Sequence, residues 1–223
     1  MISVIIPTLN EEKHIIQVLQ RLNQESTPHE IIVVDGGSSD RTVDFACSLA
    51  KVIPSRPGRG LQLNEGVKFA QGEVLFFLHG DCLIEPGTLD EIEDVIRKGF
   101  IGGCLTQTIL DSNPVFRLIE STGNVRARAR KIFYGDQSIF VRKDVFLKLG
   151  AFRPLLLFED VEFSRRLRRE GRTIVLSKRV YTSSRRWNRQ GILKTTLINR
   201  MLLMLFYFRF PTSLLSKWYR NVR

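Results

Sequence analysis

Residues 74–81 read Val-Leu-Phe-Phe-Leu-His-Gly-Asp, and this stretch decides the fold. A run this short and this apolar, bounded by Gly72 and Gly80, is typical of a strand buried on both faces of a parallel sheet. Ligands bind at the carboxyl ends of the strands in such sheets, so we expect Asp81 to lie where chemistry takes place. The alternative is that Asp81 is a surface aspartate that opens a turn.

The segments on either side of this strand alternate between strand and helix patterns. Strands are predicted at 2–7, 31–34, 52–53, 102–109 and 138–141. Helices are predicted at 11–23, 41–50, 61–70, 114–130, 143–149 and 159–170, with Asn10 and Asp40 as N-caps of the first two. Strand, turn and helix repeated with short connections predict an α/β fold with a Rossmann-like, doubly wound, mostly parallel sheet.

The length and the cysteines fit an intracellular domain. A chain of 223 residues can bury a core for one α/β domain with a modest appendage. The three cysteines, Cys47, Cys82 and Cys104, are scattered and lack metal-ligand spacing, which favours a reducing compartment. The first residues read as a strand rather than a signal peptide. We therefore expect a cytoplasmic protein.

The positive charge is concentrated in the last part of the chain. From residue 161 onward there are 16 Lys and Arg but only two acidic residues, a balance of +14, whereas the first 160 residues have a balance of −3. Such a surface suggests nucleic acid, anionic lipid or a phosphorylated substrate as a partner. The alternative is that the basic residues only increase solubility.

Residues 191–223 form a basic extension with many apolar side chains. The longest uninterrupted apolar run, 201–208, is far shorter than the roughly 20 residues that span a bilayer. Apolar residues flanked by Arg, Lys, Trp218 and Tyr219 predict amphipathic helices that lie in an anionic headgroup region, peripheral at the inner face of the cell membrane. The alternative is that these helices pack on the domain itself or on a second copy in a homo-oligomer.

Seven motifs occur in order along nearly the whole chain. They are 7–12 (PTLNEE), 33–42 (VVDGGSSDRT), 58–60 (GRG) with Gln62, Asn64 and Gly66, 78–81 (LHGD), 135–142 (GDQSIFVR), 158–162 (FEDVE) and 185–187 (RRW). Together they resemble the family 2 glycosyltransferases of GT-A fold. The resemblance implies a nucleotide-sugar half at 1–99, an acceptor half at 100–190 and the helical extension at 191–223.

The resemblance places the base of the donor at the first two strands. Asp35 would hold a uracil-type base, and Pro7, Thr8 and Glu11 would form the floor of its pocket. A carboxylate at the end of a strand can accept a hydrogen bond from a ring N–H. The alternative for Asp35 is a structural turn supported by the glycines that follow. A UDP-sugar is the favoured donor and a GDP-sugar is the second choice.

The donor diphosphate is expected at two glycine-flanked segments. Gly80 would border the nucleotide, and Arg59 suits a diphosphate oxygen, although it can also be an ordinary solvated loop arginine. Asp81 is the predicted ligand for Mn²⁺ or Mg²⁺, which would bridge the two phosphates. The family usually has Asp-x-Asp here, whereas this chain has His79 first. His79 remains open as a second metal ligand, a ribose contact or a packing residue.

The resemblance also implies a catalytic carboxylate in the acceptor half. Asp160, at the start of a predicted helix, would take the proton from an acceptor hydroxyl, and in-line attack would invert the anomeric configuration. The alternative is an aspartate that stabilises the helix N-terminus. Glu159 is expected to be structural or to face the acceptor.

Four further residues are expected to contact the acceptor or the donor sugar. Asp136 and Gln137 form a polar pair before a strand. Arg186 can bind phosphate in a bidentate manner, and Trp187 offers a face on which a sugar ring can stack. The alternative for the second pair is a surface cation–π contact.

Other classes of protein explain the sequence less completely. A nucleic-acid-binding module is not expected, because no such motif occurs and the basic region has few interleaved aromatic residues. A dinucleotide-dependent oxidoreductase would need Gly-x-Gly-x-x-Gly in the first turn. A membrane scaffold without activity would not need Asp35, Asp81 and Asp160 together. We therefore predict an inverting, metal-assisted glycosyltransferase acting on a hydroxyl acceptor, with a nucleotidyltransferase as the alternative enzyme.

Overall fold

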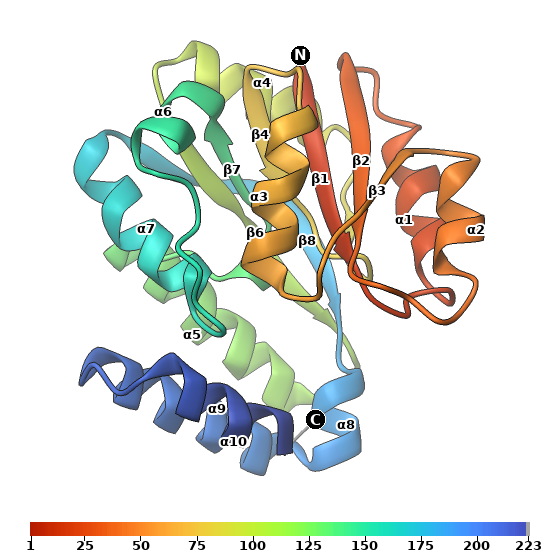
Figure 1. The fold of residues 1–223 in the computed structure, drawn as a ribbon. Helices are drawn as coiled ribbons and strands as arrows, with labels where there is room; N and C mark the ends of the chain where they lie inside the picture. Colours follow the sequence, from red (N-terminus) through yellow and green to blue (C-terminus); the bar gives the residue numbers. More distant parts are fainter. Residues whose placement is uncertain (222–223) are drawn as a thin grey trace.

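The computed structural model describes residues 1–221, so Val222 and Arg223 of the predicted extension lie outside the described residues. The chain folds around an eight-stranded sheet with the order β3-β2-β1-β4-β7-β6-β8-β5 (Figure 1). Strands β1 (Ile2–Thr8), β2 (His29–Asp35), β3 (Lys51–Pro54) and β4 (Val74–Phe77) are parallel. The predicted doubly wound, mostly parallel sheet is therefore confirmed.

The second half of the sheet is mixed. Strand β7 (Ile139–Arg142) runs antiparallel to both β4 and β6 (Gly102–Leu110), and β6 is parallel to β8 (Thr173–Ser183). The two-residue strand β5 (Leu83–Ile84) closes the edge, antiparallel to β8. Neither β5 nor β8 was predicted. The Ser177-Lys178-Arg179 segment interrupts the apolar pattern of β8, and a bulge between Cys104 and Thr106 shifts its register with β6.

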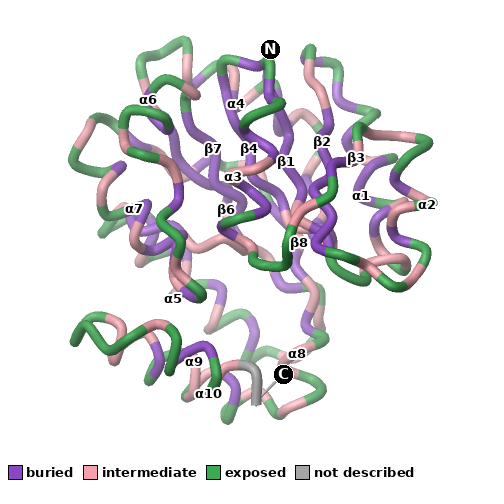
Figure 2. Tube along the Cα trace, viewed as in Figure 1, coloured by how far each residue is buried: buried purple, intermediate pink, exposed green. Residues whose placement is uncertain are grey.

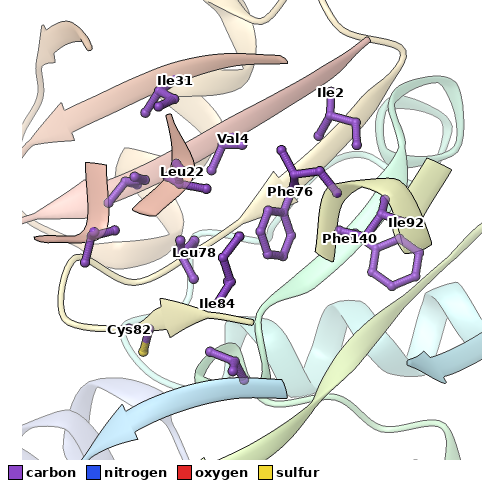
Figure 3. Close-up of a cluster of buried hydrophobic side chains, with 14 of the residues drawn as sticks. Ile2, Val4, Leu22, Ile31, Phe76, Leu78, Cys82, Ile84, Ile92 and Phe140 are labelled. Atoms are coloured by element: carbon purple, nitrogen blue, oxygen red, sulfur yellow. The ribbon is translucent and has the colours of Figure 1, made fainter. Parts of the chain in front are cut away.

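Helices cover both faces of the sheet. Helices α1 (Ile15–Leu22), α2 (Thr42–Cys47) and α4 (Thr88–Arg97) pack on one face, where Figure 3 shows Val4, Phe76 and Ile92 in one cluster of buried side chains. The other face is covered by α3 (Arg59–Phe69), α5 (Pro114–Arg130), α6 (Lys143–Lys148) and α7 (Glu159–Glu170). Successive strand residues point to opposite faces, so the apolar run from residue 74 supplies both layers.

Helix α3 lies unusually close to the sheet because Gly66 faces it. A Cβ at Gly66 would lie 2.6 Å from the Ile5 Cγ2 and 2.8 Å from the Val34 Cγ2, so a side chain there would push the helix away. This close packing holds the N-terminus of α3, and with it Arg59, over the carboxyl ends of the strands.

Neither predicted N-cap is the observed one, since His14 precedes α1 and Arg41 precedes α2. Asn10 does not cap α1, which begins at Ile15; Asn10 adopts φ 57° and its Oδ1 accepts from the Ser39 N–H at 2.9 Å. Asp40 does accept from the Thr42 N–H at 3.0 Å, at the start of α2. Asn10 therefore connects the turn after β1 to the turn after β2 and does not start a helix. Helix α4 was not predicted.

The extension forms two helices below the sheet domain, α9 (Ile192–Tyr207) and α10 (Thr212–Asn221), and α8 (Arg185–Gln190) precedes them (Figure 1). Leu202 and Leu215 are buried against Leu157, and the Phe206 ring lies 5.1 Å from the Phe158 ring. Figure 2 shows that much of the remaining surface of α9 and α10 is exposed. Among residues 1–221 we find no helix whose length and apolarity would let it span a bilayer.

Candidate active site

The carboxyl ends of β1, β2 and β4 meet at one edge of the sheet, as the sequence predicts. Thr8 is paired with Asp35, and Ile5 is paired with Phe77 in the parallel ladders. The turn that contains His79, Gly80 and Asp81 follows β4 directly. A Cβ at Gly80 would lie 3.2 Å from the Thr8 Cγ2, so the two turns are in close contact. The nucleotide-binding candidates of the first half are thus brought together.

Asp35 is buried and holds a turn of its own chain. One carboxylate oxygen accepts from the N–H groups of Gly37 (2.9 Å) and Ser38 (2.8 Å), and the other accepts from the hydroxyls of Thr8 (3.1 Å) and Ser38 (2.5 Å). These four donors match the roughly four acceptor sites of a carboxylate. A nucleobase N–H can therefore bind Asp35 only by taking the place of one of them.

Asp81 is held by an arginine that the sequence analysis did not assign. The Arg185 Nη2 lies 2.8 Å from a carboxylate oxygen of Asp81 and 3.3 Å from one of Glu11. Burial alone raises the pKa of Asp81, but His79 and Arg185 outweigh it and hold that pKa below its usual value. Burial and the nearby Asp81 charge raise the pKa of Glu11. A hollow of about 220 Å³ opens beside Asp81 between His14 and Leu110.

Asp160 lies in a second carboxylate pair at the start of α7. One oxygen of Asp160 accepts from the Gly135 N–H at 2.6 Å and from the Arg59 Nη2 at 3.2 Å, and the other accepts from the Val161 N–H at 2.7 Å. Arg59 also donates to Glu159, whose side chain is 3% exposed. Burial lowers the pKa of Arg59, but the two carboxylates raise it well above its ordinary value. We name Arg59, Glu159 and Asp160 the inner cluster, and Arg185, Glu11 and Asp81 the outer cluster.

Gly135 is the point where three candidate residues converge. A Cβ at this position would lie 3.0 Å from the His79 Nε2, 3.1 Å from an Arg59 nitrogen and 3.1 Å from an Asp160 oxygen. Burial and the Arg59 charge lower the pKa of His79, which keeps the imidazole neutral at pH 7. His79 thus stands between the two clusters, near Asp81 in sequence and near Asp160 in space.

Asp136 and Gln137 have different surroundings. Gln137 is fully buried, and its side-chain oxygen accepts from Arg126 at 2.7 Å. Asp136 accepts from the Gln107 Nε2 at 2.8 Å through one oxygen, while its other oxygen is buried and has no hydrogen-bond partner within residues 1–219. Of the two, only Asp136 keeps an acceptor for a ligand.

Arg186 and Trp187 lie on the side of α8 that meets other helices. The Arg186 guanidinium stacks over the Tyr219 ring at 3.9 Å and also donates to its hydroxyl. The Trp187 ring packs edge-on against Phe116 at 5.7 Å. Arg186 thus forms a cation–π contact with Tyr219 and not with Trp187. Its neighbour Arg185 is the residue of this motif that reaches the sheet edge. The only sequence signal for Arg185 was its place next to Arg186-Trp187.

The donors around Asp81 fit a divalent cation. Ligand atoms of His79, Asp81 and Cys82 lie within 4.8 Å of one another. Burial raises the pKa of the Cys82 thiol well above its usual value, so it is not a thiolate at pH 7. A carboxylate and a neutral imidazole suit Mn²⁺ or Mg²⁺ with further oxygen ligands from phosphate and water. The cation that Asp81 binds in this structure is Arg185.

Comparison with known proteins identifies relatives of most of the chain. Residues 3–150 match the family described as "Glycosyl transferase family 2". The glycosyltransferase AglE of Haloferax volcanii is 26% identical over 183 residues, which cover 74% of this chain and 60% of that protein. A dolichol-phosphate mannosyltransferase of Pyrococcus furiosus is 32% identical over 44% of this chain and 30% of its own length. The chain therefore spans at most about three fifths of these relatives.

Solved structures share the fold. TarS of S. aureus in complex with UDP has a TM-score of 0.68 at 23% identity, covering 82% of this chain and 60% of that one. The mannosyltransferase PcManGT of Pyrobaculum calidifontis, in complex with GDP-Man and Mn²⁺, has a TM-score of 0.64 at 22% identity, covering 81% and 56% of the two chains. The likeness confirms the predicted GT-A fold.

Proposed function

The chain belongs to glycosyl transferase family 2, and we propose that it moves a sugar from a nucleoside-diphosphate sugar to a hydroxyl acceptor with inversion. The observation that carries the proposal is the meeting of the inner cluster and the His79–Asp81 turn around Gly135. Leaving-group stabilisation and proton removal require charged groups on both sides of one anomeric carbon. Family membership favours this reaction over the nucleotidyltransferase alternative.

The donor base is proposed to bind between β1 and β2. Pro7, Thr8 and Glu11 border this pocket, and Asp35 offers an acceptor when a base N–H replaces the longest of its contacts, the one from the Thr8 hydroxyl. A UDP-sugar is the favoured donor, supported by the UDP complex of TarS, and a GDP-sugar is the second choice, supported by the GDP-Man complex of PcManGT.

The diphosphate is proposed to bind across the Gly80 turn. Asp81, with His79 as the second donor, would hold Mn²⁺ or Mg²⁺ there. A divalent ion at this place neutralises the charge that develops on the departing diphosphate. Arg59 can bind a phosphate oxygen as well, because its guanidinium has donors beyond those that face Glu159 and Asp160.

Asp160 is proposed as the general base. The N–H groups of Gly135 and Val161 orient its carboxylate. The acceptor oxygen attacks the anomeric carbon, the bond from that carbon to the diphosphate oxygen breaks, and the hydroxyl proton goes to Asp160. Attack from the face opposite the leaving group gives inversion. Asp136, through its unpartnered oxygen, is proposed to bind a sugar hydroxyl of the acceptor or the donor.

The test is sugar transfer by purified protein. We expect UDP-GlcNAc or another nucleotide sugar in a donor panel to be consumed with Mn²⁺ present, releasing the nucleoside diphosphate. Asp81→Asn should lose nearly all of this turnover, whereas Asp144→Asn, which changes an exposed carboxylate on α6, should retain it. Full turnover by Asp81→Asn would contradict the proposal.

The extension is proposed to rest on an anionic membrane at the inner face of the cell membrane. Four exposed residues of α9 and its C-cap residue lie along one face at spacings of three and four: Leu193, Leu197, Met201, Met204 and Phe208. Leu197 is 70% exposed and Phe208 is 72% exposed. No Asp or Glu occurs between Arg185 and Asn221, so only basic side chains flank this face. Apolar burial and attraction to anionic lipid would act together.

Vesicle binding tests the membrane proposal. The protein should co-sediment with phosphatidylglycerol vesicles at low salt, and less with phosphatidylcholine vesicles. Leu197→Glu should weaken binding severalfold, while Leu147→Glu, a change at a 55% exposed leucine on α6, should not. Absence of co-sedimentation would contradict the membrane proposal. A dimer in solution that Leu197→Glu dissociates would instead assign this face to a second copy of the chain.

A further inference from the structure

Arg185 stands where the catalytic edge needs a cation. It is the first residue of α8, directly after β8, and its Nη2 is shared between Asp81 (2.8 Å) and Glu11 (3.3 Å). The chain therefore returns from its last strand to place a guanidinium on the carboxylate that follows β4. No other Lys or Arg forms an ion pair with Asp81 or Glu11 among residues 1–219, whose side chains the structure describes.

This ion pair is accessible to solvent and solutes. The side chains of Arg185, Glu11 and Asp81 are 50%, 23% and 27% exposed. Ion pairs with this exposure contribute only about 1 kcal/mol or less, so a competing ion can break them. By contrast, Glu159 of the inner cluster is 3% exposed. The outer pair is thus suited to exchange its cation.

We propose that Arg185 is a built-in counter-ion that occupies the divalent-cation site and moves to the donor diphosphate when a metal ion binds Asp81. This inference rests on the proposed function. An arginine and a divalent cation repel each other at the same carboxylate oxygen, so binding of one disfavours the other. A guanidinium released from Asp81 is well shaped for phosphate oxygens, which it binds in a bidentate manner.

The exchange makes Arg185 a positioning residue with two opposite effects. It should weaken metal binding to the protein alone, because it competes for Asp81. It should strengthen binding of a nucleoside diphosphate once the metal is present, because it then contacts phosphate. A residue with only a structural role would not move these two affinities in opposite directions.

Mn²⁺ binding to the full chain tests the first effect. Electron paramagnetic resonance of free Mn²⁺ gives the affinity for the wild type and for Arg185→Gln, Arg185→Lys and Arg189→Gln. Arg185→Gln should bind Mn²⁺ about fivefold more tightly, the gain expected on removing a partly exposed ion pair. Arg185→Lys should lie between it and the wild type. Arg189→Gln removes the same charge from an exposed residue of the same helix and should match the wild type.

UDP binding by calorimetry at saturating Mn²⁺ tests the second effect. Arg185→Gln should bind UDP about tenfold more weakly, as expected for a lost charged contact to phosphate. An unchanged or weaker Mn²⁺ affinity in Arg185→Gln would overturn the inference, and so would unchanged UDP binding. Sugar transfer by the wild type is measured separately, so the proposed function can stand while the inference fails. Absence of Mn²⁺ binding in every variant would overturn both the inference and the metal site.

Discussion

The inner and outer clusters have the same composition but different surroundings. Each places one arginine between a glutamate and an aspartate, yet Glu159 of the inner cluster is 3% exposed, whereas Glu11 of the outer cluster is 23% exposed. The inner pair is fixed by main-chain N–H groups at Gly135 and Val161. The outer pair has no comparable main-chain contact to Asp81 within the described residues. Burial thus separates a cluster that orients a base from one that can exchange its cation.

The largest expected effect is on the base of the inner cluster. Asp160→Asn keeps the shape of the side chain but cannot take a proton, and its single amide oxygen can accept only one of the hydrogen bonds from Gly135 and Val161, which go to different carboxylate oxygens. We expect turnover to fall by about a thousandfold, within the range of general base catalysis, with UDP binding nearly unchanged. Single-turnover measurements with a nucleotide sugar check this. A fall of less than about tenfold would move the base to another residue.

The second largest effect is on stability, where removing the charge of Glu159 in the inner cluster should cost more than removing that of Glu11 in the outer cluster. Glu159→Gln removes the charge of one of the two buried carboxylates that pair with Arg59 and should lower the free energy of unfolding by about 2 kcal/mol. Glu11→Gln changes an exposed pair and should cost less than about 1 kcal/mol. Urea unfolding of both variants measures the difference. Equal losses of unfolding free energy in the two variants would show that burial does not make the inner cluster more important for stability than the outer cluster.

The parts of the fold that the sequence predicts are those that local patterns determine. The strands up to β4, and the meeting of Thr8, Asp35 and Asp81 at one edge, follow from apolar runs that end in polar turns. The helix at 159–170 was predicted with its observed bounds because its apolar spacing is regular. Local patterns of this kind need no knowledge of tertiary contacts.

The remaining parts depend on contacts between segments that lie far apart in the sequence. Strand β8 was missed because charged residues fall in its middle, and so the path that brings Arg185 to Asp81 was missed as well. Gln137 looked like a ligand contact, but the fold buries it completely against Arg126. A single sequence shows neither which side of α8 faces the site nor which carboxylates share an arginine.

A smaller effect is expected where the clusters meet. Gly135→Ala adds a Cβ within 3.1 Å of His79, Arg59 and Asp160, so at least one of these side chains must move. We expect a loss of about 1–2 kcal/mol in stability, as for other overpacked sites, together with reduced turnover. Gly123→Ala is the control, since its Cβ would meet only Gln107 at 3.7 Å and lies in α5, where alanine favours the helix. Normal turnover by Gly135→Ala would show that the convergence tolerates displacement.

The smallest effect is a dependence of stability on pH that separates the two histidines. Burial, followed by the Arg59 charge, lowers the pKa of His79, and burial, followed by Arg185, lowers the pKa of His14. Below about pH 6.5 the unfolded imidazoles take up protons while the folded ones do not, so the free energy of unfolding falls as the pH drops from 6.5 toward the folded pKa values. His79 contributes at most about 1.4 kcal/mol per pH unit, and His14 contributes less because solvent screens the charges around it.

Urea unfolding between pH 7 and pH 5, with chelator present, resolves the two contributions. His79→Asn should flatten the pH dependence more than His14→Asn, because His79 is the more deeply buried residue and lies against the inner cluster. The single variant Arg59→Gln should also have a flatter pH dependence of stability than the wild type, because the Arg59 charge would no longer repel a protonated His79. The reverse ranking of the two histidine variants would mean that the outer cluster, and not the inner one, excludes the proton.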